Sequence, residues 1–185
     1  MTAKEKYVLA EELWREYERD KAWDLFVEAY QGGYLPAANA IGDFYYYGVF
    51  RDRDYTEAIR WFSIGADAGI PLSFHAIGSA YHQMSQYSLA ISWYKKAIEH
   101  GYVPAYHDLG YIYENGIGVS ADADIAIMYY KGGAVLNDVD CMRALGNIYN
   151  FSGLVAANTQ EARYWYKRAA DEGDKDSELF LSMLA

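Results

Sequence analysis

Three histidines are the first residues of this chain to consider as metal ligands, because imidazole nitrogen is a common ligand of zinc. His75 and His82 are seven residues apart, which on a helix rising 1.5 Å per residue separates them by about 10.5 Å. Nitrogen ligands lie about 2.0–2.1 Å from zinc, so this pair cannot share one ion. His107 stands further along the chain, with no cysteine near it. We therefore predict no metal site and no cofactor.

Carboxylates and the single cysteine add little that could support catalysis. Asp43 and Glu114 are candidate acid–base groups, but they are far apart in the sequence and no nucleophile accompanies either one. The chain contains no Gly-x-Ser-x-Gly, no phosphate-binding loop and no His-Glu-x-x-His. Cys141 is the only cysteine, so it cannot form an intrachain disulfide. We predict a non-enzymatic protein without catalytic residues; an enzyme of unrecognised type is the least favoured alternative.

Composition narrows the class of partner. The 185 residues are 52% hydrophobic and 23% charged, which is typical of a globular protein. The net charge of −10 disfavours nucleic acids and anionic membranes, because both require a basic face. A basic protein partner is compatible with it. No apolar run approaches the roughly 18 residues of a membrane span, and charged residues close to Met1 argue against a signal peptide. We expect a cytoplasmic protein.

A repeated pattern organises the elements that would position these residues. Glycine followed three residues later by tyrosine recurs at Gly42, Gly78, Gly110 and Gly146, in steps of 36, 32 and 36 residues. An aromatic pair follows each glycine: Trp61-Phe62, Trp93-Tyr94, Tyr129-Tyr130 and Trp165-Tyr166. A fixed period of this size is typical of stacked helical repeats. Each repeat is expected to hold a first helix, called helix A here, that carries the glycine, and a second, called helix B, that carries the aromatic pair.

Several positions within the repeat always hold small or cap-forming residues. Alanine precedes the aromatic pair by three residues, and a corresponding alanine occurs at Ala22 near the N-terminus. A mid-helix glycine costs about 1 kcal/mol relative to alanine, so its recurrence indicates that helix A and helix B approach closely there. Helix B should end at a left-handed residue, which is Gly33, Gly69, Gly101, Asn137 or Gly173. Cys141 falls in a further small-residue position, so we expect it to be packed rather than reactive.

These positions divide the chain into one repeat domain, 1–185. We predict an N-terminal capping helix pair in 1–35, with helices over 4–19 and 22–30. Four repeats follow at 36–70, 71–103, 104–139 and 140–174, and a C-terminal capping helix occupies 175–185. The second repeat is short, because four residues are missing between its helices. Asp54, Asp122 and Asn158 are expected to cap helix B, whereas Gln86 is a weak cap.

The quoted residues resemble a known family. Tyr113-Glu114-Asn115-Gly116-Ile117-Gly118-Val119 and Ala162-Arg163-Tyr164-Trp165-Tyr166-Lys167-Arg168-Ala169-Ala170 are similar to the Sel-one-like repeat, a branch of the tetratricopeptide-like α/α solenoids. The resemblance covers about residues 20–185. It implies an all-α fold of about ten helices in a right-handed superhelix. The fourth repeat departs from the pattern at Phe151-Ser152-Gly153-Leu154.

The resemblance also implies where a partner would bind. In tetratricopeptide-like repeats helix A lines the concave groove, through positions three before, one after and four after the repeat glycine. These positions share one helical face but differ between repeats. They are Asn39, Asp43, Tyr46, His75, Ser79, His82, His107, Tyr111, Glu114, Arg143, Asn147 and Asn150. We expect Tyr46, His82 and Tyr111 to be the anchors.

A scaffold or adaptor that binds a protein or peptide in this groove is the function that the resemblance implies. The alternative is an inhibitor or immunity-type protein that blocks one specific enzyme or toxin. The acidic balance and the small size are compatible with either one.

Overall fold

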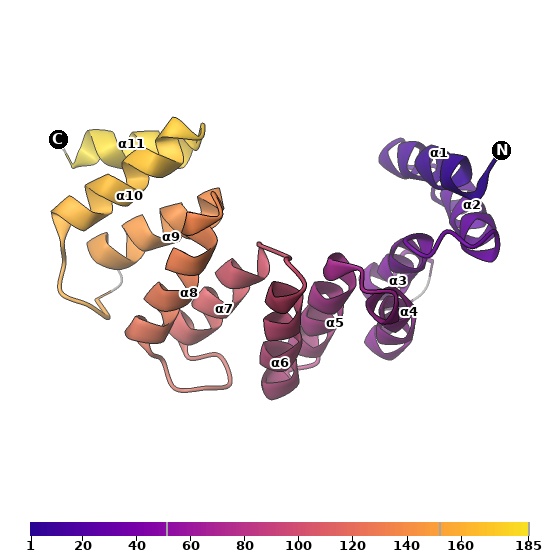
Figure 1. Ribbon diagram of the computed structural model, residues 1–185, viewed down its shortest axis with the longest axis horizontal. Helices are drawn as coiled ribbons and strands as arrows, with labels where there is room; N and C mark the ends of the chain where they lie inside the picture. Colours follow the sequence, from indigo (N-terminus) through magenta and orange to yellow (C-terminus); the bar gives the residue numbers. More distant parts are fainter. Residues whose placement is uncertain (51, 152, 185) are drawn as a thin grey trace. The chain divides into compact units, whose positions relative to one another are not determined.

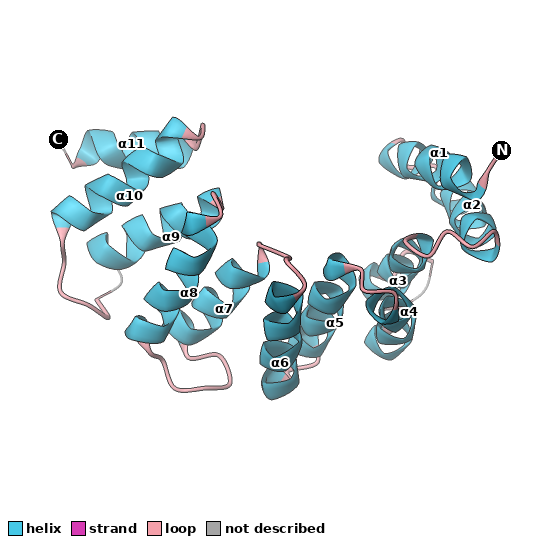
Figure 2. Ribbon diagram, in the orientation of Figure 1, coloured by secondary structure: helices cyan, strands magenta, loops and turns pink. Residues whose placement is uncertain are grey.

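The computed structural model of this protein describes residues 1–50, 52–151 and 153–184. Over these residues the chain forms eleven α-helices and no β-strand (Figure 1; Figure 2). The prediction of an all-α protein built from stacked helix pairs is therefore confirmed. Three residues lie outside the described part: Arg51, Ser152 in the divergent connection of the fourth repeat, and Ala185 at the end of the predicted C-terminal cap.

The helices fall into two compact units, Met1–Gly101 and Tyr102–Ala185, called unit 1 and unit 2 here. Unit 1 contains α1 (Ala3–Arg15), α2 (Arg19–Gln31), α3 (Ala37–Tyr47), α4 (Tyr55–Asp67), α5 (Pro71–Gln83) and α6 (Tyr87–Glu99). Unit 2 contains α7 (Ala105–Asn115), α8 (Ala123–Val135), α9 (Val139–Asn150), α10 (Thr159–Asp171) and α11 (Lys175–Met183). Helices that are neighbours in the sequence of one unit pack against each other (Figure 1).

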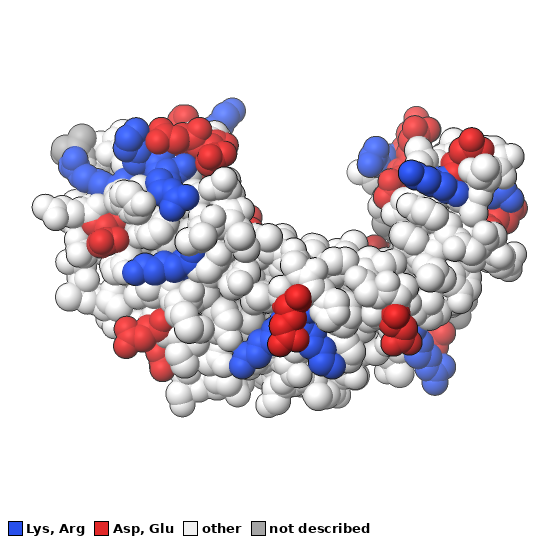
Figure 3. Space-filling model, viewed as in Figure 1, with Lys and Arg blue, Asp and Glu red and all other residues white. Residues whose placement is uncertain are grey.

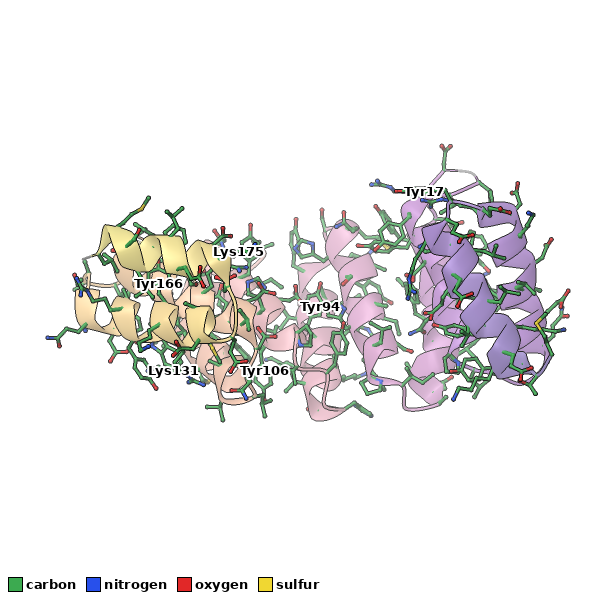
Figure 4. All side chains as sticks on the ribbon, turned by 90° about the horizontal axis from the view of Figure 1, so that it is seen from above. Tyr17, Tyr94, Tyr106, Lys131, Tyr166 and Lys175 are labelled. Carbon is green, nitrogen blue, oxygen red and sulfur yellow. The ribbon has the colours of Figure 1, made fainter. Side chains whose placement is uncertain are left out.

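Only glycine fits at the centre of helix A, because a ring of helix B fills the space that a side chain would occupy. A Cβ atom added to Gly110 would lie 2.3 Å from Cε1 of Tyr130. The other repeats repeat this contact, with nearest distances of 2.5 Å (Gly42–Phe62), 2.8 Å (Gly78–Tyr94) and 2.4 Å (Gly146–Tyr166). Tyr94 and Tyr166 are labelled in Figure 4. The predicted close approach of the two helices is confirmed, and the ring involved is the second member of each aromatic pair.

The other repeated positions also have the roles expected of them. All five alanines of the helix B position are fully buried, and Cys141 is buried too. Asn137 has φ of 62°, so it ends its helix in the same left-handed conformation as the glycines of the other repeats. Asp54, Asp122 and Asn158 each accept a hydrogen bond from a backbone N–H in the first turn of helix B. No side-chain cap of this kind occurs at Gln86.

The first helix is shorter than predicted. The expected helix over 4–19 ends at Arg15, and α2 begins at Arg19 rather than at residue 22. Tyr17, labelled in Figure 4, adopts φ of 64° in the turn between them. The amide of Glu18 then donates to the carbonyl of Leu13 at 3.0 Å, which satisfies one of the last carbonyls of α1. An aromatic residue seldom adopts positive φ, so no feature of the sequence indicates that the helix ends here.

Candidate functional site

The twelve predicted groove residues all lie on the helix A elements α3, α5, α7 and α9. Their side chains differ widely in exposure. Tyr111 is the most exposed of them, with 49% of its surface accessible, whereas only 6% of the surface of Asn39 is accessible. The other ten are partly buried. Exposure alone therefore singles out Tyr111 as available for contact with a partner.

Helix B tyrosines hold several of these side chains in place. The ring that passes beside the repeat glycine reaches the helix A face, where its hydroxyl donates a hydrogen bond. The bonds are Tyr94 Oη to Ser79 Oγ (3.3 Å), Tyr130 Oη to Glu114 (2.7 Å) and Tyr166 Oη to Asn147 Oδ1 (2.8 Å). Burial raises the pKa of Tyr166 to about 12, and burial with the Glu114 carboxylate raises the pKa of Tyr130 further. The hydroxyls of Tyr130 and Tyr166 therefore stay protonated donors at physiological pH.

The first repeat lacks such a donor. Phe62 occupies the helix B position that is tyrosine in the other three repeats, and it has no hydroxyl. Asp43, one residue after the repeat glycine, has no hydrogen-bond or ion-pair partner among the described residues. Burial raises the pKa of this carboxyl to about 7, because the charged form loses part of its hydration. Asp43 is therefore a largely buried carboxyl whose charged form a cation or a hydrogen-bond donor would stabilise.

Asn39 differs from the expectation that it faces the groove. Its side-chain oxygen accepts a hydrogen bond of 2.8 Å from the buried hydroxyl of Ser73. It also lies against the backbone of Gly65, where an added Cβ would be 2.6 Å from the oxygen. Asn39 thus ties α3, α4 and α5 together inside unit 1. A buried polar group is retained when it is hydrogen-bonded in this way, so the structure gives Asn39 a packing role.

Arg143 is also engaged within the fold. Its guanidinium donates to Asp174 at 2.6 Å and forms a second ion pair with Asp140. Asp174 precedes α11 and caps it, accepting from the amide and hydroxyl of Ser177. Burial alone would raise the pKa of Asp174, but the Ser177 hydrogen bonds and the Arg143 charge lower it below its usual range. This cluster fastens the last helix of unit 2 to α9.

Aromatic neighbours surround the histidines and Tyr46. The ring centroid of His75 lies 5.3 Å from that of Tyr94, His82 lies 5.4 Å from Tyr87, and His107 lies 5.7 Å from Tyr130. Tyr46 contacts the rings of Tyr47, Tyr55 and Phe62 at 4.9, 5.4 and 6.5 Å. Among the described residues, no group of three or more His, Cys, Asp or Glu side chains could hold a metal ion. Each of these three histidines lies beside one helix B ring and remains partly exposed.

A pocket in unit 1 adds residues that the sequence pattern did not indicate. It has a volume of about 200 Å³ and includes Tyr7, Glu11 and Trp14 of α1 beside Asp43 of α3. The first two helices carry no glycine–tyrosine pattern, so residues of α1 could not be aligned with the groove positions of the repeats. The only cue was the helical spacing of apolar residues in α1, which does not identify the facing helix.

Charged groups on the face shown in Figure 3 are interspersed by sign, with lysines and arginines next to aspartates and glutamates. The chain also forms surface ion pairs between residues three or four apart on one helix, such as Arg60 with Glu57 and Lys167 with Asp171. Within the described part of the chain, no helix is long and apolar enough to cross a membrane.

Stacked helix pairs, four of them joined through a glycine and a ring, define an α/α repeat protein. The sequence matches the Sel1 repeat at residues 35–70, 80–102, 103–132 and 139–174. This chain belongs to the Sel1 repeat family. Sel1 repeats generally mediate protein–protein interaction, and the family is generally non-enzymatic.

Solved structures share the fold over nearly the whole chain. A Sel1 repeat protein from Oxalobacter formigenes is 27% identical with a TM-score of 0.75, covering 95% of this chain and 75% of its own. A protective antigen with an SLR fold from uropathogenic Escherichia coli is also 27% identical, with a TM-score of 0.75, over 98% of this chain and 41% of its own. An immunity protein from Pseudomonas aeruginosa is 22% identical, with a TM-score of 0.62, over 98% of this chain and 69% of its own, and shows the fold alone.

A curated relative shares part of the sequence. The chitin synthase regulator SKT5 of Malassezia restricta is 28% identical over 129 residues, which covers 63% of this chain. The match spans only 9% of the length of that relative.

Proposed function

We propose that this chain is a non-enzymatic scaffold that holds a partner protein or peptide on the faces of its helix A elements. One observation carries the proposal. The positions that pack helix A against helix B hold a glycine and a buried aromatic ring in every repeat, whereas the outward positions of helix A differ in chemical type between repeats. Structural constraint alone accounts for the uniform positions, and a varied, partly open face is what recognition of a particular partner requires.

Tyr111 is the proposed anchor of unit 2, because tyrosine is favoured in the fully desolvated centre of interfaces. His82 is the proposed contact in unit 1. Tyr46 is less suited to test the proposal, since it packs against three other rings and its removal would disturb the fold.

We further propose that the partner is basic, given the net charge of −10 of the chain. We also propose that the chain acts in the cytoplasm, where the buried Cys141 remains a thiol.

The test is capture of partners from a native lysate by the tagged chain. The double variant His82→Ala and Tyr111→Ala should reduce partner recovery at least tenfold, since interface anchors often contribute about 2 kcal/mol or more each. Lys95→Ala with Lys131→Ala is the matched control on helix B, at exposed positions; Lys131 is labelled in Figure 4. Loss of capture by the lysine variant alone would reject the helix A face. Capture of one stoichiometric enzyme would favour the inhibitor alternative over the scaffold.

A further inference from the structure

The pocket of unit 1 combines aromatic walls with carboxylates. Trp14 of α1 meets Phe44 of α3 edge to face, with ring centroids 4.8 Å apart. Both line the pocket, as do Tyr7, Glu11 and Asp43. The hydroxyl of Tyr7 donates to Glu11 Oε1 at 2.8 Å, which fixes the Glu11 carboxylate at the pocket wall. The pocket therefore presents two carboxylates among the faces and edges of aromatic rings.

Arg19 places its guanidinium 4.3 Å from the ring centroid of Trp14, but among the described residues no ion pair reaches the carboxylates of this pocket. Among its described lining residues there is no lysine, arginine or histidine. Asp43 is also the groove position that the first repeat leaves without a hydroxyl, since Phe62 replaces the tyrosine of the other repeats. A partly buried carboxylate without a partner is costly to keep ionised. A cation that enters the pocket would therefore supply Asp43 with a positive charge and a hydrogen-bond donor.

The ring content decides which cation fits. A hydrated inorganic ion gains nothing from aromatic walls, whereas the ammonium or guanidinium of a side chain is attracted to ring faces and carries an apolar stem that the rings can cover. The exposed Leu72 at the rim of the pocket adds apolar surface for such a stem. The pocket thus matches a long, flexible cation in both charge and apolar surface.

We propose that this pocket binds the side chain of a lysine or arginine that a partner protein presents to α1 and α3. The inference rests on the proposed function and adds to it the chemistry of one contact. Asp43 forms the ion pair, and Glu11 supplies the second carboxylate. The partly buried ring of Trp14 and the exposed Leu72 cover the stem of the bound side chain, while the buried ring of Phe44 supports Trp14 from behind. Charge complementarity with a protein of net charge −10 supports a basic partner.

The experiment titrates the full chain with N-acetyl-arginine amide and N-acetyl-lysine amide, following the indole N–H resonance of Trp14 by NMR. The neutral N-acetyl-citrulline amide and N-acetyl-norleucine amide are the matched probes. Both cationic amides should produce a saturable shift of the Trp14 signal, and the neutral probes should not. Equal shifts with cationic and neutral probes would overturn the proposal. Binding of spermidine at least tenfold tighter than either amide would also overturn it, by identifying a free polyamine as the occupant.

Variants then test the role of the carboxylate. Asp43→Asn should weaken binding of both cationic amides at least tenfold, while Asp24→Asn, an exposed change on α2 outside the pocket, should leave it unaltered. Phe62→Tyr restores the hydroxyl found in the other repeats and should weaken binding as well, because Asp43 then has a donor within the fold. Undiminished binding by Asp43→Asn would reject the pocket.

The outcome is separable from the proposed function, because the capture variants lie on other residues. If the Asp43→Asn chain no longer binds the amides but still captures its partner, the pocket contact is dispensable and the scaffold proposal stands. If the amides bind in the pocket while the His82 and Tyr111 variant captures normally, the pocket stands and the proposed helix A anchors are wrong.

Discussion

At the scale of single residues, the close contact between Gly110 and Tyr130 explains both the glycine and the ring. A side chain at position 110 would collide with a ring that is itself fully buried. The same ring carries the hydroxyl that orients Glu114 on the outer face. One pair of residues therefore sets the spacing of two helices and also positions a polar group on the surface that we propose for binding.

Replacing Gly110 by valine should lower the free energy of unfolding by about 2 kcal/mol or more, because buried Tyr130 cannot yield to the added atoms without strain. Asn137→Gly is the control at a residue where glycine already serves in other repeats, and it should be neutral or mildly stabilising. Urea denaturation monitored by circular dichroism measures both. A Gly110→Val chain as stable as the wild type would contradict the helix contact.

Asp43 should make stability depend on pH. Its folded pKa of about 7 lies above the unfolded value, so the folded state holds a proton that the unfolded state has released between about pH 4 and pH 7. Stability from this group is complete below that window, falls as the pH rises through it, and is level above pH 7. The other titratable groups described around Asp43 are Glu11 and Tyr7 on α1 and Tyr47 on α3.

Asp43→Asn removes the ionising group and should therefore raise Tm more at about pH 8 than at about pH 5, relative to the wild type. Thermal melts of both chains in matched buffers give the comparison. Asp24→Asn, exposed on α2, should show no such difference between the two pH values. An equal Tm change at both pH values would show that Asp43 titrates normally in the folded chain.

At the scale of elements, the last helix of unit 2 depends on polar contacts more than the other helices of that unit do. The last helix, α11, buries only Ser177 completely among its described residues. Its attachment relies on Asp174, which caps the helix and also binds Arg143 of α9. A helix with so little buried apolar surface gains little from packing, so the cap and the ion pair have a large share in its stability.

Asp174→Ala should therefore destabilise unit 2 by about 2 kcal/mol, from loss of the helix cap and of a partly buried hydrogen-bonded charge pair. Asp176→Ala, an exposed change in the first turn of the same helix, should alter the free energy of unfolding by less than about 0.5 kcal/mol. Hydrogen exchange of the α11 amides, combined with urea denaturation, distinguishes the two. Equal protection in both variants would mean that Asp174 does not secure α11.

At the scale of the whole molecule, each unit has a core of its own. In unit 1 the buried set includes Phe26, Ile41 and Phe44, and in unit 2 it includes Tyr130 and Leu145. Each helix pair packs against its neighbours within its unit, as expected for a repeat protein whose stability accumulates from local interfaces. The acidic charge of −10 is a property of the complete chain and acts on a partner before any contact forms.

This charge should make association with a basic partner depend on salt. The association rate constant should fall several-fold as NaCl is raised from about 0.05 to about 0.5 M, because long-range attraction is screened beyond the Debye length. The dissociation rate should change much less. Stopped-flow or surface-binding kinetics with the captured partner provide the measurement. An association rate independent of salt would exclude electrostatic steering and the basic partner that we propose.

The sequence by itself determined the repeat period, the all-α fold and the contacts within each helix pair, because these depend on local spacing and on side-chain size at recurring positions. Gly110 beside Tyr130 and the left-handed Asn137 followed from such spacing. The predicted domain boundaries and groove residues remain predictions.

Only the tertiary structure showed which of the groove residues already form hydrogen bonds with other residues of the chain. The hydroxyl of Tyr130 satisfies Glu114, and Ser73 of the next repeat buries Asn39. Asp43 lacks such a donor and shares a pocket with Trp14 of α1. These contacts join residues 16 to 34 positions apart or lie between helices that share no sequence pattern. Side-chain packing across helices fixes them, and the spacing of residues along one helix carries no information about that packing.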